Sequence, residues 1–224
     1  MSTIAVIQPC FYPYGGYFRL FAAADIVVFF DCVQFPRRGW VHRNRFTLAS
    51  GELDWLTLPI AKAERDVRID RLRFSPDARL RVTQAIQRFP LLVRAHRTLN
   101  ETIERMLDIP DSDVAAYLCG RVRDVATRLG FERPTVRSSK MDLDPALKGQ
   151  DRVIAAVRAL GGTHYVNPSG GRELYSGDEF ARAGLDLRFL TPYEGKMDSI
   201  LSRLLAEPID AITREIDEQT RLTT

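Results

Sequence analysis

The stretch that decides the fold is residues 4–31, IAVIQPCFYPYGGYFRLFAAADIVVFFD. It contains two short continuous apolar runs, residues 4–7 and 26–30, which is typical of strands buried on both faces of a parallel sheet. Between them lie a loop rich in aromatic residues and a segment, residues 17–24, whose apolar positions favour one face of a helix. The order strand, loop, helix, strand predicts a right-handed crossover between two parallel strands.

The segments that follow predict a hairpin and then a group of helices. Residues 46–48 and 55–60 resemble two strands around a turn at Ser50-Gly51, and residues 67–72 alternate apolar and charged positions like a half-exposed strand. From residue 77 to residue 130 apolar residues recur at helical spacing, and three helices are expected between Pro90, Pro110 and Gly130. The clearest helix covers 112–129, with Ser112 or Asp113 as its cap.

An alternating pattern returns after residue 130. Strands are expected at 135–137, 163–167 and 185–190, and helices at 151–160, 178–183, 199–205 and 209–220. We therefore predict one domain of the α/β class, with a doubly wound, mostly parallel, Rossmann-like sheet. Its parts are an N-terminal α/β half (1–75), a helical insert (76–130) and a C-terminal α/β half (131–224).

Composition excludes several classes of protein. The chain has 224 residues and a formal net charge of +3, which is too small for a protein that coats nucleic acid. Its three cysteines are scattered, so neither a disulfide framework nor a cysteine-based zinc site is expected. No apolar run is long enough to span a bilayer, and the chain does not open like a signal peptide. We expect a cytoplasmic protein without membrane insertion.

Three loops follow predicted strands and should meet at one edge of the sheet. They are residues 8–16, 31–38 and 167–171, and ligands of doubly wound sheets bind at this edge. Asp31 ends a buried strand and is the first candidate for a catalytic base, the alternative being a residue that starts a turn. His42 is the second candidate, the alternative being a structural histidine. No pair of histidines has metal-ligand spacing, so no metal site is predicted.

The candidate binding residues are amides, aromatic rings, arginines and glycines. Residues 37–45 mix arginine with tryptophan, and arginine forks suit phosphate or carboxylate, although a solvated hairpin face or a contact with single-stranded nucleic acid would also explain them. Gly15-Gly16 before a helix could bind an anion. The complete predicted set is Gln8, Tyr12, Tyr14, Gly16, Tyr17, Gln34, Arg38, Trp40, Arg43, Asn44, Arg45, Asn167, Ser169, Gly170, Gly171, Glu173 and Tyr175. The motifs GxGxxG, GxxxxGK[ST] and GxSxG are absent, which argues against the enzyme classes that use them.

Two groups of these residues together resemble the signatures of the WbqC-like protein family. The first comprises residues 7–9, 11–14, 16–18, Asp31, 33–35, Arg38, Trp40 and 43–45, with Cys10 as a departure. The second comprises Tyr165, 167–168, 170–171, 173–175 and Phe180. The resemblance implies a place in bacterial surface-polysaccharide or O-antigen biosynthesis, and a transferase that acylates an amino sugar with a glycyl or similar group. A nucleotide-linked sugar and an activated aminoacyl donor, such as an aminoacyl-tRNA, are the substrates it implies.

A looser resemblance links the first strand, loop and helix to the nucleotidyltransferase-like fold. That resemblance implies ATP and Mg²⁺, but the first loop here has tyrosines and glycines where those enzymes have paired histidines. Three hypotheses follow: an acyltransferase for amino sugars, a nucleotidyl-transfer or ligase-like enzyme that uses ATP, and a non-catalytic protein that binds a nucleotide or an aminoacyl-RNA.

Overall fold

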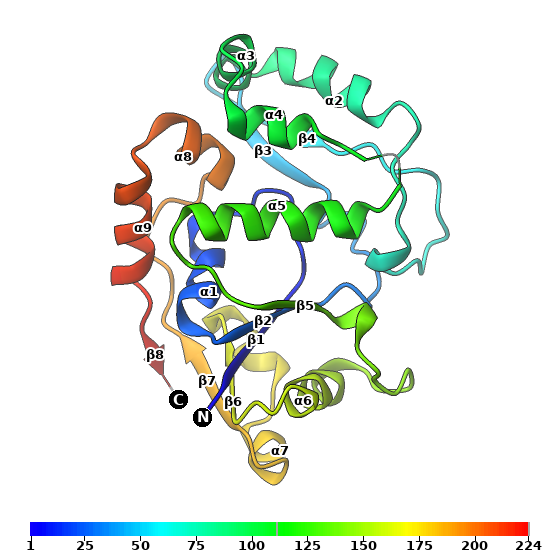
Figure 1. The fold of residues 1–224 in the computed structure, drawn as a ribbon, viewed down its shortest axis with the longest axis vertical. Coiled ribbons are helices and arrows are strands. Elements are labelled where there is room, and N and C mark those ends of the chain that lie inside the picture. Colours follow the sequence, from blue (N-terminus) through cyan, green and yellow to red (C-terminus); the bar gives the residue numbers. More distant parts are fainter. Residues whose placement is uncertain (111, 224) are drawn as a thin grey trace.

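A six-stranded sheet forms the centre of the protein. The computed structural model describes residues 1–110 and 112–223. The strand order is β5-β2-β1-β6-β7-β8, and all neighbours are parallel except the short β8 (Figure 1). The strands are β1 (Thr3–Ile7), β2 (Ile26–Phe29), β5 (Thr135–Arg137), β6 (His164–Asn167), β7 (Asp186–Leu190) and β8 (Leu222–Thr223). The predicted doubly wound, mostly parallel α/β fold is confirmed, although β8 was not predicted.

The strand order reverses beside β1. The chain passes from β1 through the short helices η1 (Gly15–Phe18) and α1 (Arg19–Ala23) into β2, which pairs with Ile7 opposite Phe29. On its other side β1 pairs with β6, with Ala5 opposite Val166. The carboxyl ends of β1 and β6 therefore share one edge of the sheet at the switch point, where ligands of such sheets bind.

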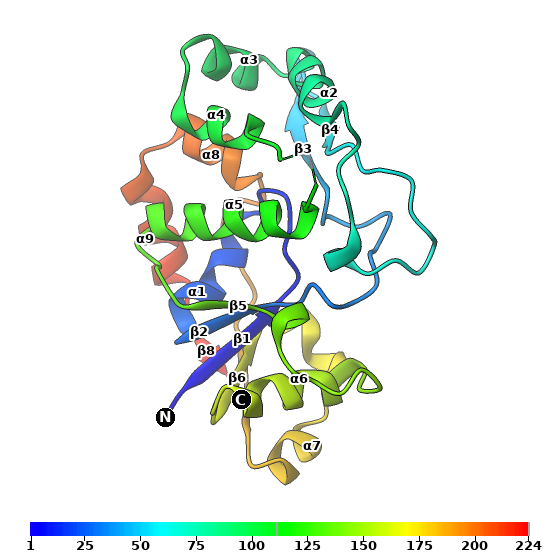
Figure 2. The same ribbon diagram turned by 45° about the vertical axis from the view of Figure 1, so that its right-hand side comes forward.

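Side chains of β1 alternate between two apolar cores, as expected for a strand buried on both faces. Ile4 and Val6 join the smaller core, to which α6 (Gly149–Ala159) and α7 (Gly177–Arg182) contribute. Ala5 and Ile7 join the larger core on the opposite face, with residues of α1, α5 (Val114–Arg128) and α9 (Ile209–Glu218). Figure 2 shows α6 and α7 on one side of the strands and α5 on the other.

A second lobe lies beyond α5, at the top of Figures 1 and 2. It contains the antiparallel hairpin of β3 and β4, which was predicted with slightly shifted bounds, and the helices that follow it. Among the described residues the insert has four α-helices rather than the predicted three. The elements are β3 (Arg43–Thr47), β4 (Leu53–Thr57), α2 (Ala78–Ala85), η3 (Ile86–Arg88), α3 (Pro90–Arg97) and α4 (Glu101–Leu107), joined by α8 (Ile200–Ala206).

Two details of the insert test the sequence patterns. The carboxylate of Asp113 accepts a hydrogen bond from the backbone N–H of Ala116 at 2.9 Å, so it caps α5 as predicted. The strand expected at 67–72 is wrong, because Ile69–Arg71 form the short helix η2. Arg68 pairs with Asp70 two positions away, and Ile69 and Leu72 are both buried, so the alternation reflects a turn that packs beside α5.

The remaining short helices are η4 (Ser138–Lys140) and η5 (Ser169–Leu174). Within residues 1–110 and 112–223, no helix combines the length and the apolar character that crossing a bilayer requires.

Candidate functional site

The loop after β1 is held in a strained conformation by neighbouring elements. Tyr12 has φ of +46°, a left-handed value that residues other than glycine rarely adopt. Its carbonyl oxygen accepts hydrogen bonds from Asn44 Nδ2 at 2.6 Å and from Ser199 Oγ at 2.8 Å. The N–H of Phe11 donates to the carbonyl of Val41 at 3.0 Å. Backbone strain that the surroundings stabilise in this way is frequent at ligand sites.

This loop forms one wall of a cavity of about 300 Å³. We call it the aromatic cavity, and its lining residues are Cys10, Pro13, Tyr14, Tyr17, Trp40, Asn44, Arg45 and Met197. The loop after β1 therefore meets residues 40–45 here, together with Met197 from the segment before α8. Residues 31–38, the second of the three loops expected at this edge, contribute no lining residue. Trp40 is 46% exposed and the Arg45 guanidinium lies 5.3 Å from the centre of its ring. Flat apolar walls beside one cation suit a ligand with a ring and a negative charge.

Three titratable side chains of the aromatic cavity, Cys10, Tyr14 and Tyr17, are protonated at neutral pH. Burial raises the pKa of the Cys10 thiol to about 12 and raises the pKa of Tyr14. Burial also holds the pKa of Tyr17 well above its usual value, and the Tyr17 hydroxyl donates to the carbonyl of Gln8 at 2.6 Å. The Cys10 thiol and the Tyr14 hydroxyl can donate hydrogen bonds to a ligand, whereas the hydrogen of the Tyr17 hydroxyl is already bonded to the Gln8 carbonyl. None of the three groups is a base in the resting protein.

Asp31 lies at the carboxyl end of β2 as predicted, but its carboxylate is enclosed. The residue is 0% exposed. Its oxygens accept from Arg137 Nε at 2.6 Å, from the hydroxyls of Ser138 and Ser139 at 3.1 and 2.8 Å, and from the Ser139 N–H at 2.8 Å. A carboxylate with these four donors has no oxygen left for a solute, so the geometry favours a structural connection between β2 and the end of β5.

Arg43 also contacts the protein rather than the aromatic cavity. Its guanidinium donates to the carbonyls of Gly39 at 3.1 Å and Arg38 at 2.5 Å, and it lies 4.1 Å from the ring centre of Trp55. We therefore assign it the role of ordering the 38–43 loop, which leaves Arg45 as the cation of the cavity.

Two other candidates from the sequence have structural contacts. Gln34 is exposed and its amide donates to the carbonyl of Arg65 at 3.2 Å. Gly16 packs against the rings of Tyr14 and Tyr193, where an added Cβ would lie closest to Cε2 of Tyr14 and 2.7 Å from Cγ of Tyr193. The absence of a side chain at Gly16 is thus explained by ring packing.

The segment 167–175 begins at the expected edge of the sheet, but none of its residues lines the aromatic cavity. The Tyr165 hydroxyl lies 3.2 Å from Asn167 Oδ1 and 3.1 Å from the Tyr175 hydroxyl, and its ring stacks on Phe180. Gly171 leaves room for the Asn167 amide, which a Cβ would strike. These members of the second signature pack together on the face of the sheet that α6 and α7 cover. Ser169, Gly170 and Glu173 are nearer the surface, and their binding role stays a prediction.

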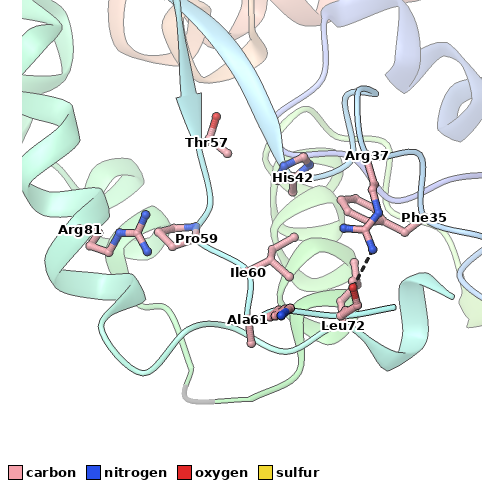
Figure 3. Close-up of a pocket in the computed structure, with 11 residues that line it drawn as sticks. Phe35, Arg37, His42, Thr57, Pro59, Ile60, Ala61, Leu72 and Arg81 are labelled. Carbon is pink, nitrogen blue, oxygen red and sulfur yellow. Dashed lines mark hydrogen bonds between the residues drawn. The ribbon is translucent and has the colours of Figure 1, made fainter. Parts of the chain in front are cut away.

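His42 belongs to a different cavity, of about 340 Å³, which we call the basic cavity (Figure 3). Its lining residues are Phe35, Arg37, His42, Thr57, Pro59, Ile60, Ala61, Lys62, Ala63, Leu72 and Arg81. Burial, with a contribution from Arg43, lowers the pKa of His42 to about 4, so its imidazole is neutral at pH 7. In the described part of the chain no cluster of His, Cys, Asp and Glu could hold a metal ion.

The sequence did not identify three residues that shape the site. Met197 lines the aromatic cavity, Ser199 donates a hydrogen bond to the Tyr12 carbonyl, and Tyr193 packs on Gly15 and Gly16. They lie between β7 and α8, far from the first loop in sequence. Of these, only Ser199 carried a signal, as the start of the predicted helix 199–205.

Comparison with known proteins agrees with the two signatures. A protein of Mycobacterium tuberculosis (strain ATCC 25618 / H37Rv), described as "Uncharacterized protein Rv1507c", is 37% identical over 60 residues, which is 27% of this chain and 26% of that protein. No solved structure shows significant similarity. The sequence pattern of the WbqC-like protein family matches residues 8–196, which include both signatures except Ile7, and every residue of the aromatic cavity except Met197. The chain belongs to the WbqC-like protein family.

Proposed function

We propose that this protein is a transferase that acylates an amino sugar in bacterial surface-glycan biosynthesis, and that the aromatic cavity binds the nucleotide-linked sugar. The observation that supports it best is the composition of that cavity. Trp40, Tyr14 and Tyr17 supply flat rings, and Arg45 supplies the only positive charge among its lining residues. A nucleotide-linked amino sugar presents the matching parts, namely a base, a sugar and a diphosphate.

The position of the cavity in the fold supports the same ligand class. Cys10 and Pro13 belong to the loop that leaves β1 at the switch point of the sheet. Crevices at such points bind nucleotides in many α/β proteins, which makes this support an analogy of fold. Asn44 and Ser199, which fix the loop, would act as positioning residues.

In this proposal the protein accelerates the reaction mainly by orientation. The amine of the sugar attacks the carbonyl carbon of the aminoacyl donor, a C–N bond forms, the donor's alcohol or phosphate leaves, and the amine proton passes to the leaving group or to solvent. Holding both substrates in reactive geometry can supply a large share of a rate enhancement without a dedicated base. The protonated Tyr14 hydroxyl would orient the sugar by donating a hydrogen bond, and the Tyr17 hydroxyl, whose hydrogen is bonded to the Gln8 carbonyl, would accept one.

The test is a search for an amide product. The protein is incubated with nucleotide-linked amino sugars and with aminoacyl-tRNA or aminoacyl phosphate, and the products are identified by mass spectrometry. We expect a mass increase equal to one aminoacyl residue, and its loss in Trp40→Ala. The control is Leu53→Ala, because Leu53 is an exposed apolar residue of the β3–β4 hairpin that does not line the cavity. An amide that forms equally fast without protein would contradict the proposal.

A non-catalytic binding protein is the second candidate. It is favoured by the enclosure of Asp31, whose carboxylate oxygens are all engaged by protein donors, and by the raised pKa values of Cys10, Tyr14 and Tyr17, which keep these three groups protonated at neutral pH. Binding of a nucleotide-linked amino sugar, with no product from any aminoacyl donor, would select this candidate over the transferase.

A further inference from the structure

The basic cavity shares no lining residue with the aromatic cavity. It lies at the end of the β3–β4 hairpin, where Thr57, Pro59 and Ile60 form one side and α2 contributes Arg81 (Figure 3). Its function is therefore a separate question from that of the proposed sugar site.

The charges around this cavity have one sign. Arg37, Lys62 and Arg81 line it, and none of its eleven lining residues is acidic. In Figure 3 the guanidinium groups of Arg37 and Arg81 lie on opposite sides of Ile60. Arg81 Nη1 lies 3.8 Å from a carboxylate oxygen of Asp77, the residue that precedes α2. Arg37 donates to the carbonyls of Ala63 and Glu64 with Nη2 alone, and a guanidinium has further N–H donors on its other nitrogens.

The floor of the basic cavity is apolar. Phe35, Pro59 and Leu72 are buried and line it, and Ile60 is half-buried beside them. A volume of about 340 Å³ is at the small end of the range for organic ligands. Inorganic phosphate alone would leave this apolar surface uncovered.

The imidazole of His42 adds a polar group with a buried nitrogen that lacks a hydrogen-bond partner. Its Nδ1 is buried and has no hydrogen-bond partner among the described residues, while the ring packs edge-on against Phe35 with centres 4.9 Å apart. Buried polar atoms without a partner are rare in native proteins and often mark a site whose ligand or water is absent.

From the three cations, the unpartnered imidazole and the apolar floor, we propose that the basic cavity binds an organic phosphate monoester. The phosphate would contact Arg37, Lys62 and Arg81, and the organic group would lie on Ile60 beside the edge of Phe35. A bound dianion would also stabilise the charged form of His42, so its pKa should rise on binding.

The experiment uses the whole protein and phenyl phosphate as the probe, with inorganic phosphate and benzoate as comparison ligands. Affinity is measured by calorimetric titration at pH 7, and the His42 imidazole is followed by NMR, its signal being assigned with His42→Gln. We expect phenyl phosphate to bind at least about tenfold more tightly than either comparison ligand, and to raise the His42 pKa from about 4.

Variants locate the bound phosphate. Arg81→Ala and Lys62→Ala should each weaken phenyl phosphate binding about tenfold or more. Arg79→Ala is the matched control, because Arg79 is an exposed arginine of the same helix that does not line the cavity. An equal loss of phenyl phosphate affinity in Arg79→Ala would show that the effect comes from the net charge of the protein rather than from the cavity, and would overturn the proposal.

Three further results would overturn the inference. They are the absence of binding to the parent protein, equal binding of benzoate, and loss of binding in Arg45→Ala with none in Arg81→Ala. The last result would place the phosphate in the aromatic cavity. None of these results depends on whether the protein makes an amide, so failure here and failure of the proposed transferase are distinguishable.

Discussion

Replacing Asp31 with asparagine separates a structural role for this residue from the catalytic role that its place in the sequence suggests. The two side chains have nearly the same shape, but the amide carries N–H donors where the carboxylate has an acceptor. If the amide nitrogen takes the place of Oδ2 it faces Arg137 Nε, and if it takes the place of Oδ1 it faces the Ser139 N–H. Neither partner can accept a hydrogen bond, so each orientation of the introduced amide leaves two donors opposed.

The size of the effect follows from these contacts. Breaking a buried ion pair by removing one charge typically costs about 3–5 kcal/mol of unfolding free energy. Arg137 keeps a second carboxylate, Asp113, at 3.1 Å, so the lower end, about 3 kcal/mol, is expected. For a chain of this length that corresponds to a fall in Tm of about 6–12 °C.

The assay is thermal and urea unfolding of Asp31→Asn, followed by ligand titration at a temperature where the variant is folded. Asp66→Asn is the matched control, because Asp66 is exposed. We expect the control to melt with the parent, and Asp31→Asn to keep ligand affinity once folded. A Tm within about 2 °C of the parent, together with abolished turnover, would refute the structural role and make Asp31 the base.

Three further predictions follow from the site. Arg45→Ala should raise the Kd of an anionic ligand of the aromatic cavity about tenfold or more, measured by calorimetry, while Arg38→Ala, outside the cavity, should not. Gly16→Ala should reduce the unfolding free energy by about 1–3 kcal/mol, measured in urea, because its Cβ would strike the Tyr193 ring; an unchanged midpoint would contradict the packing. The pKa of His42 is near 6.5 in the unfolded chain and about 4 in the folded protein, so the unfolded chain binds the proton more readily. The unfolding free energy should therefore fall by about 1–2 kcal/mol as the pH drops from 6.5 to 4. His42→Gln should remove that part of the slope, and an unaltered slope would show that other groups cause it.

The sequence predicted the parts of the fold that depend on local pattern. Continuous apolar runs identified β1 and β2, and the cap at Asp113 identified the start of α5. The rule that parallel strands end at one edge of the sheet placed the loops after β1 and β6 at the same edge. It did not indicate that residues 40–45, rather than 31–38, would form the cavity wall opposite the first loop. These features need only neighbouring residues or a general rule of topology.

The candidate site was less predictable, because its details depend on residues that are distant in sequence. Nothing near Asp31 indicates that residues 137–139 would satisfy its carboxylate, more than a hundred positions away. Arg43 and Arg45 belong to the same arginine-rich stretch and were equal candidates for binding an anion, but only the structure shows that Arg43 donates to nearby carbonyls while Arg45 borders the cavity. The Tyr193 ring likewise gives Gly16 a packing role that two adjacent glycines alone do not reveal.

Saturation-transfer NMR with a nucleotide-linked amino sugar is the most direct test of the central claim, which is that the aromatic cavity binds this ligand. Selective irradiation of the protein should transfer most strongly to ligand ring protons that lie on Trp40, Tyr14 and Tyr17. We predict strong saturation transfer to the base or sugar protons in the parent protein and in Leu53→Ala, whose exposed side chain lies outside the cavity, and its loss in Trp40→Ala. Absence of transfer in the parent, or equal transfer in Trp40→Ala, would contradict the account.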